Sequence, residues 1–213
     1  MVLNYNNFMF GFSDRELKVL KKLSTPVKIQ DWLETIPNNF ELQGDTCMSP
    51  RQVLKKRTAH CIEGAMLAAV ALRLQGHPPL IVDLKAVYKD DDHVIAVFKQ
   101  RGRWGAISKV NHSVLRYRDP VYQNLRELVM SYFNEYYLQN RKKSLRSYSK
   151  PLDLSRFDKR GWMTSEKDLR YIAEYLDQSK HFDIVPKYLL KKLRRVEPIE
   201  IKAGNIERWS KHR

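Results

Sequence analysis

Hydrophobic residues recur at helical spacing through the first 60 positions of the chain. The stretch at 13–23 opens with Ser13, which can cap a helix, has Glu16 at the capping-box position and carries its leucines on one face. A run at 27–36 has similar spacing, and Ser49 followed by Pro50 is a start signal for another helix. The pattern therefore predicts three short amphipathic helices, over residues 13–23, 27–36 and 51–56.

Residues 59–75 are apolar nearly all round, which is typical of a helix that is buried on every side. Small residues such as Gly64, Ala65 and Ala68 allow neighbouring elements to approach it closely. Gly76 follows as a residue suited to ending a helix. We expect this segment to be the central helix of the fold.

Beyond residue 76 the pattern changes to that of strands. Runs at 80–87, 94–98 and 104–110 are expected to be strands, and Arg101-Gly102 supplies a turn between the last two. The resulting fold class is α+β: a short antiparallel sheet packs on the central helix, with further helices flanking both.

The second half of the chain is more basic and less regular. Helices are predicted at 125–138, 165–176 and 185–195, whereas residues 141–156 are expected to wrap over the surface. The tail after Pro198 is weakly patterned. We therefore divide the chain into a core with N-terminal helices, residues 1–140, and a basic helical extension packed on that core, residues 141–213.

Length and composition fit one sizeable core, since the chain has 213 residues of which 43% are hydrophobic. It has no uncharged apolar run of the ~18 residues that a membrane span needs, and its first ten residues lack the pattern of a signal peptide. Two cysteines in different contexts, Cys47 and Cys61, do not make a disulfide framework. We expect a cytoplasmic protein.

The formal net charge of +15 favours an anionic partner, either an acidic protein or a nucleic acid. Basic residues cluster at 55–57, 141–143 and 191–195, but none of the usual nucleic-acid recognition motifs is present. We expect weak, salt-sensitive binding, on a surface separate from the candidate chemistry at Cys61 or at its rim. A solvated basic face without a dedicated partner is the simpler alternative.

That chemistry combines Cys61, at the start of the central helix, with His93, at the start of a strand. A thiol becomes a nucleophile when its thiolate is stabilised, and the positive end of a helix dipole does this. A nearby imidazole can take the proton and hold the ion pair. Asp90 to Asp92, just before His93, would favour the charged imidazolium.

The order of these elements resembles the transglutaminase-like branch of the papain-like cysteine fold, over about residues 27–120. The strings DDHV at 91–94, WGAISK at 104–109 and LRYRDPVY at 115–122 are similar to an uncharacterised bacterial family of transglutaminase-like proteins, up to about Trp162. The resemblance implies Cys61 as nucleophile and His93 as base. It further implies thiol-dependent acyl or amide chemistry on a peptide or other amide-bearing substrate.

In the superfamily, an aspartate on the adjacent antiparallel strand is the third member of a catalytic triad with the cysteine and the histidine. In this sequence that position falls on Ser108. If Arg101-Gly102 is the turn, Gln100 pairs with Arg103 and Ser108 lies diagonal to His93 on the same face. Asn111 is on the opposite face unless a bulge redirects it. We therefore expect Ser108 or Asn111, and no carboxylate, at the far nitrogen of His93.

Other interpretations of the same residues stay open. Cys61 can be an inert core thiol, and the fold can serve as a catalytically degenerate binding module. Zinc is a rival, but the spacing of His60, Cys61, His77 and His93 is not that of a metal site, and we expect neither metal nor cofactor.

Two neighbours of Cys61 are given structural roles. Glu63 is expected to pair with a basic residue, either Lys55, Arg57 or Arg116. His60 could donate near an oxyanion, but we expect it to point away from the thiol.

Overall fold

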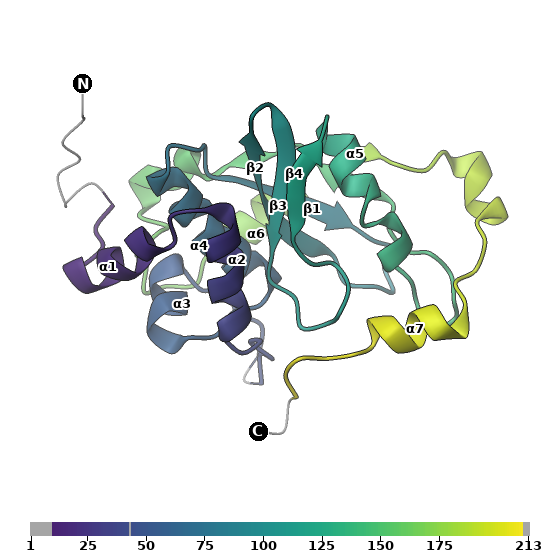
Figure 1. Cartoon of the computed structure of the whole chain (residues 1–213), viewed down its shortest axis with the longest axis horizontal. Helices are drawn as coiled ribbons and strands as arrows, with labels where there is room; N and C mark the ends of the chain where they lie inside the picture. The colour runs from purple at the N-terminus through teal and green to yellow at the C-terminus, as the bar shows by residue number, and fades with distance from the viewer. Residues whose placement is uncertain (1–9, 43, 211–213) are drawn as a thin grey trace.

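An open antiparallel sheet forms the centre of the computed structural model, which describes residues 10–42 and 44–210 (Figure 1). The strand order is β4-β3-β2-β1-β5-β7, and β6 also pairs with β1. The fold is thus mixed α/β, with helices flanking an antiparallel sheet. The strands are β1 (Leu80–Lys85), β2 (His93–Gln100), β3 (Arg103–Ser108), β4 (Arg118–Tyr122), β5 (Ser147–Ser149), β6 (Leu152–Asp153) and β7 (His181–Asp183).

The helices before the sheet begin where the capping residues predict. Ser13, Thr25 and Ser49 each accept a hydrogen bond from the backbone N–H three residues on, and proline is the first residue of α2 and α3. The α-helices are α1 (Asp14–Lys22), α2 (Pro26–Thr35), α3 (Pro50–Lys56), α4 (Cys61–Leu74), α5 (Leu125–Met130), α6 (Arg170–Asp177) and α7 (Pro198–Gly204). The short 3₁₀ helices are η1 (Phe133–Glu135), η2 (Leu154–Arg160) and η3 (Lys187–Lys192).

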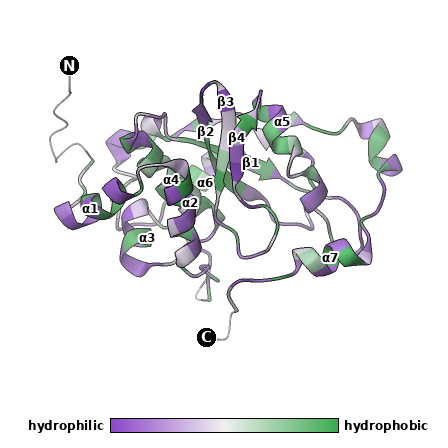
Figure 2. Ribbon diagram, viewed as in Figure 1, coloured by the Kyte–Doolittle hydropathy of each residue, from purple (hydrophilic) through white to green (hydrophobic). Residues whose placement is uncertain are grey.

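Helix α4 is the centre of the larger core, since every residue from Ile62 to Leu72 is buried. It packs on one face of the sheet, through Val94, Ala96 and Phe98 of β2, and on the side chains of α1 to α3. The alternate residues of the same strand, such as Ile95 and Val97, face a second core with α5. Figure 2 shows hydrophilic residues on the outer turns of α1 and α2, as this layering requires.

The hairpin of β2 and β3 has the register that its turn predicts. Arg101 and Gly102 both have positive φ, +49° and +78°, which fits the two-residue turns that match the twist of paired strands. Gln100 pairs with Arg103, and the ladder continues to Ile95 opposite Ser108. The side chain at Ser108 is therefore carried to the His93 end of β2.

The basic middle segment is part of the sheet and does not merely wrap over the surface. Strand β5 pairs with the end of β1, and β6 pairs with its start. Ser144, Leu145 and Ser149 are fully buried. The prediction that residues 141–156 wrap over the surface was wrong. Strand pairing uses backbone N–H and C=O groups, so a segment rich in serine and basic side chains can still form strands.

Further elements also differ from the sequence prediction. The helix predicted at 125–138 ends at Met130, where the Ser131 hydroxyl bonds the carbonyl of Leu128, and the chain continues as η1. The helix predicted at 185–195 is only the 3₁₀ turn η3, which buries no residue. Strand β4 and helix α7, in contrast, were not predicted.

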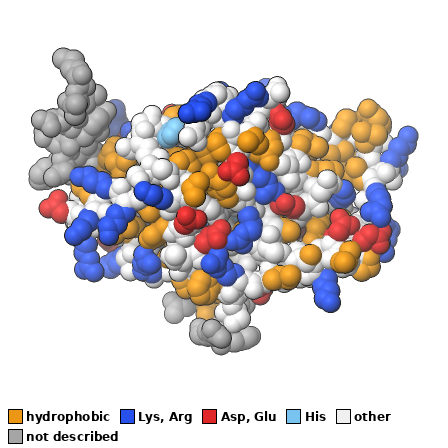
Figure 3. Space-filling model, viewed as in Figure 1, with side chains coloured by type: hydrophobic (Ala, Val, Ile, Leu, Met, Phe, Trp, Pro, Cys, Tyr) orange, Lys and Arg blue, Asp and Glu red, His pale blue; other side chains and the backbone are white. Residues whose placement is uncertain are grey.

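Charge is distributed over the molecule, with no single basic patch on the face seen in Figure 3. The clusters at 141–143 and 191–195, distant in sequence, meet at Glu197, which pairs with Arg141 at 3.6 Å and Arg194 at 2.7 Å. Among the residues described, no helix has the length and apolar character to cross a membrane.

Candidate active site

Cys61 is the first residue of α4, at the positive end of a buried helix. Arg57, in the left-handed conformation, ends α3 and turns the chain toward this start. The thiol is partly exposed and lines a cavity of about 400 Å³ together with His60, His93 and Lys109. Residues 90–92, 110–112 and 204–205 also line this cavity. The nucleophile candidate therefore faces a cavity that can admit a ligand.

His93 begins β2 and is buried beside the same cavity. Its Nε2 lies 2.7 Å from the Ser108 hydroxyl, and that hydroxyl donates its one proton to the carbonyl of Leu115. Ser108 must then accept from Nε2–H, which leaves Nδ1 of His93 as the nitrogen available to the thiol. His93 lies near enough to Cys61 to lower the pKa of its thiol.

Of the two residues considered for the third position, the structure brings only Ser108 to His93. Asn111 turns away: its amide oxygen accepts from the Trp209 N–H and its amide nitrogen donates to the Trp209 carbonyl, both at 2.9 Å. Among residues 10–42 and 44–210, no carboxylate bonds His93. The hydrogen-bond chain from His93 through the Ser108 hydroxyl thus ends at the backbone carbonyl of Leu115.

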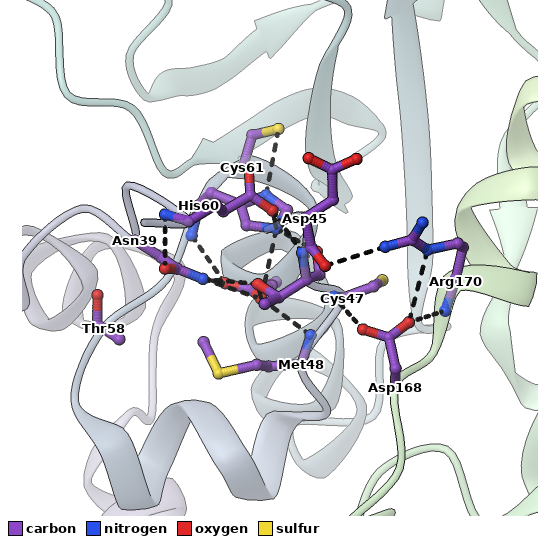
Figure 4. Close-up of polar contacts among 12 residues, drawn as sticks. Asn39, Asp45, Cys47, Met48, Thr58, His60, Cys61, Asp168 and Arg170 are labelled. Carbon is purple, nitrogen blue, oxygen red and sulfur yellow. Dashed lines mark hydrogen bonds and ion pairs between the residues drawn. The ribbon is translucent and has the colours of Figure 1, made fainter. Parts of the chain in front are cut away.

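His60 does not point away from the thiol, contrary to the sequence expectation. Its Nδ1 lies 4.0 Å from Sγ of Cys61 (Figure 4). Its Nε2 lies 2.8 Å from the carbonyl of Thr46, and a carbonyl can only accept, so Nε2 carries a proton. The sequence could not place this ring, because its position is set by Thr46, which is distant in the chain.

Glu63 is also corrected: it binds none of Lys55, Arg57 or Arg116. Its carboxylate is fully buried and lies 3.3 Å from Nε2 of His60. It accepts further hydrogen bonds from the side chains of Asn39 and Thr46 and from the backbone N–H groups of Met48 and His60. Arg116 instead pairs with Glu34. Glu63 therefore holds His60 from the side opposite to the thiol.

This arrangement favours a thiolate–imidazolium pair. Burial raises the pKa of Cys61, but hydrogen bonds and charge from His60 and His93 outweigh it and lower the pKa to about 5. Burial lowers the pKa of His60, yet Cys61 and Glu63 raise it to about 11. For Glu63, burial is again opposed, chiefly by His60, and its pKa is lowered. Thiolate, imidazolium and carboxylate thus support one another.

Cys47 has the opposite environment, although it lies in the same part of the molecule (Figure 4). It is buried, its backbone N–H is bound by Asp168, and burial together with the Asp168 charge raises the pKa of its thiol. The two cysteines are free. Only Cys61 has the environment of a nucleophile.

Lys109 is a cavity residue that the sequence did not single out. It is buried, donates from Nζ to the carbonyl of Ile36 at 2.7 Å, and has a pKa lowered by burial to about 8. A Cβ added to Gly64 would lie 2.4 Å from Cβ of Lys109. Close approach of strand and helix at this glycine fixes the lysine beside the thiol cavity.

Of the four residues considered as zinc ligands, His60, Cys61 and His93 line one cavity, and His77 lies apart from it. His77 packs edge-on against the Phe98 ring at 6.3 Å, whereas His60 and His93 flank the thiol. In the described ranges, the carboxylates of Asp83, Asp92 and Asp177 lie within 4.8 Å of one another. Each of these carboxylates already has a partner: Asp83 binds His181, Asp92 accepts from the Ala86 N–H, and Asp177 binds Lys85.

Comparison with known proteins adds no assignment: no family model matches the chain, and no curated protein matches it. The geometry of the site therefore has to indicate its function.

Proposed function

We propose that the chain is a transglutaminase-like protein of the papain-like cysteine fold, and that Cys61 performs acyl chemistry on an amide-bearing substrate. The element order supports this: a cysteine opens the buried helix, a histidine opens β2, and β3 orients that histidine. The single observation that carries the proposal is a cysteine at a helix start that lines one cavity with two imidazoles, both of which lower the pKa of its thiol.

The reaction begins when the thiolate attacks the amide carbonyl and forms a C–S bond. The backbone N–H of Cys61, in the first turn of α4, is a donor for the resulting oxyanion. The C–N bond then breaks as His93, which carries on Nδ1 the proton that the Cys61 thiol gave up, passes that proton to the leaving amine, and a thioester is produced. Water or a second amine attacks this thioester, His93 takes the proton of the attacking group, and the C–S bond breaks.

The two imidazoles have separate roles in this scheme. His60 is held by Glu63 and Thr46 at Nε2 and stays protonated, so it stabilises the thiolate as a fixed positive charge. Among the residues described, the hydrogen-bond partner of His93 is the neutral hydroxyl of Ser108 at Nε2, so His93 is the ring that gives and takes protons. Proton transfer at His93 then leaves a cation beside the sulfur throughout the cycle.

The test compares an activated ester with the matching anilide, each read by release of its chromophore and by intact mass for the acyl-enzyme. Wild type should form an acyl adduct on Cys61 and turn over. Cys61→Ala should form none, and Cys47→Ala should behave as wild type. His93→Ala should slow the anilide by about 10²–10⁴-fold, and the ester far less, because only the amine leaving group needs a proton.

Acylation by the ester without any turnover of either compound would contradict the enzymatic proposal. It would instead favour the degenerate binding module, for which the neutral Ser108 in place of a carboxylate is the supporting observation. Retention of activity in Cys61→Ala would show that the nucleophile is another residue.

A further inference from the structure

The segment at 196–209, here called the strap, lies along the rim of the thiol cavity. It contains α7 and the extended residues after it, and Figure 1 shows it running in yellow past the loop that follows β3. Gly204 and Asn205 of the strap line the same cavity as Cys61 and His93. A wall of the candidate active site is therefore made by a peripheral segment.

The strap pairs with residues 111–113 in the manner of an added strand. The Ser113 N–H donates to the Ile206 carbonyl and the Arg208 N–H to the Asn111 carbonyl, both at 2.9 Å. His112 and Glu207 form the antiparallel bridge between them. The Asn111 side chain adds its two bonds to the backbone of Trp209. All four hydrogen bonds contact main-chain groups of the strap, so they recognise an extended polypeptide with little regard to sequence.

Apart from Val196, the buried first residue of the strap, apolar burial contributes little to this docking. Gly204 is the only buried residue of α7, whereas Ile199 is 75% and Ile206 62% exposed. Nδ1 of His112 and Nε1 of Trp209 are buried without a hydrogen-bond partner among the residues described. Each such atom reduces the stability of the docked state. The ion pair of Arg208 with Glu34 is partly exposed and adds little.

We infer that residues 111–113 form a docking edge for an extended polypeptide, and that the strap is its resident and displaceable occupant. A polypeptide substrate reaches Cys61 by replacing the strap on this edge. The claim that the substrate is a polypeptide rests on the proposed function. Docking itself can be measured without any turnover.

Gly204→Leu is the variant that displaces the strap. A Cβ at Gly204 would lie 1.9 Å from Oη of Tyr137, which is itself bound to the Glu200 carbonyl. Ile199→Ala, on the exposed side of the same helix, is the matched control. Hydrogen exchange of residues 111–113 and 205–209 should be faster in Gly204→Leu than in wild type or Ile199→Ala. Arg208→Glu, which places two like charges together at Glu34, should release the strap by a second route.

A labelled synthetic peptide with the sequence of residues 204–210 then tests the edge directly. We expect it to bind Gly204→Leu, measured by fluorescence anisotropy, at least about 10-fold tighter than wild type or Ile199→Ala, because the tethered strap competes at high effective concentration. Alkylation of Cys61 by a bulky fluorescein iodoacetamide should accelerate in the variant, whereas that by iodoacetamide should not.

Three results would overturn the inference: no faster exchange in either variant, no peptide binding to a variant whose strap exchanges faster, or equal acceleration with both reagents. If the protein binds the peptide but hydrolyses no amide, the docking edge is supported and the proposed enzymatic function is contradicted.

Discussion

At Cys61, two hydrogen bonds decide which nitrogen each imidazole can offer. The Thr46 carbonyl fixes the proton on Nε2 of His60, and Ser108, whose own proton goes to Leu115, fixes it on Nε2 of His93. Both rings therefore have Nδ1 free for the sulfur. The two rings differ in their ion pairs, because the Glu63 carboxylate lies next to His60 and stabilises its positive charge, whereas it does not contact His93.

The pH dependence of alkylation by iodoacetamide should show how far His60 lowers the pKa of the Cys61 thiol. The thiolate is the reactive form, so the rate for wild type should reach half its plateau near pH 5 and stay high above it. His60→Ala removes a cation but leaves the burial, so its midpoint should rise by more than about one pH unit. Cys47→Ala is the control and should leave the midpoint unchanged. A midpoint near the ordinary thiol value in wild type would contradict the pair.

Stability should depend on pH in three steps, because Cys61 and His60 titrate as a pair. From about pH 5 to 6.5 the unfolded chain holds both protons and the folded chain one, so stability rises with pH. Between 6.5 and 9.0 each state holds one proton and stability is flat. From 9.0 to about 11 only the folded state holds one, so stability falls.

The measurement is the urea unfolding free energy of wild type minus that of the double variant Cys61→Ala/His60→Gln, taken from pH 5 to 11. The difference removes the other titrating groups to first order. A difference that rises or falls steadily across this range, with no flat middle, would show that the two groups do not form an ion pair.

At the scale of elements, helix α4 and the β2–β3 hairpin bring the thiol and His93 together, and both were predictable. The small residues of 59–75 indicated a buried helix, and Arg101-Gly102 determined the register that carries Ser108 to His93. Local signals of this kind suffice when turn geometry or helical periodicity decides the outcome.

The supports of His60 and the strap could not be predicted in the same way. Glu63 and His60 are held by residues 39–48, which carry no periodic pattern, so their contact is a product of tertiary packing. Helix α7 buries one glycine and therefore lacks an apolar stripe that a sequence could display. Strand β4 is half-exposed and contains a proline, which weakens its signal.

Gly64→Ala should stabilise an isolated helix but destabilise this protein, where the helix packs closely on β3. Alanine alone would stabilise a helix by about 1 kcal/mol relative to glycine. Here the new Cβ would lie 2.4 Å from Cβ of Lys109, so we expect a net loss of about 1–3 kcal/mol in the unfolding free energy, measured in urea. Net stabilisation would show that β3 and α4 can separate without cost.

For the whole molecule, the net charge of +15 is spread and partly paired. Arg141 and Arg194 are engaged by Glu197, which leaves Lys142, Lys191, Lys192 and Arg195 as exposed cations of the two neighbouring clusters. An anionic partner would therefore meet separated point charges. Such a surface attracts polyanions without recognising base edges.

Mixed-sequence DNA should accordingly bind weakly, and a titration at low salt and at about 0.2 M salt should show most of the affinity lost. The triple variant Lys142→Gln/Lys191→Gln/Lys192→Gln should weaken binding and flatten the salt dependence. Lys55→Gln/Lys56→Gln, on α3, serves as the comparison. Tight binding that persists at the higher salt, or strong discrimination between sequences, would promote nucleic acid to a specific partner.

The loop that holds Glu63 has a consequence for how the protein would fail on heating. Asn39, Thr46 and Met48 bind the buried carboxylate, yet none of the described residues from 39 to 48 lies in a helix or a strand, and Leu42 among them is 77% exposed. Segments of this kind open at lower free energy than the core around α4. The thiolate would then lose its fixed cation while far-UV circular dichroism still reported a native fold. Chemical inactivation and melting should be two separate transitions, the first reversible on cooling.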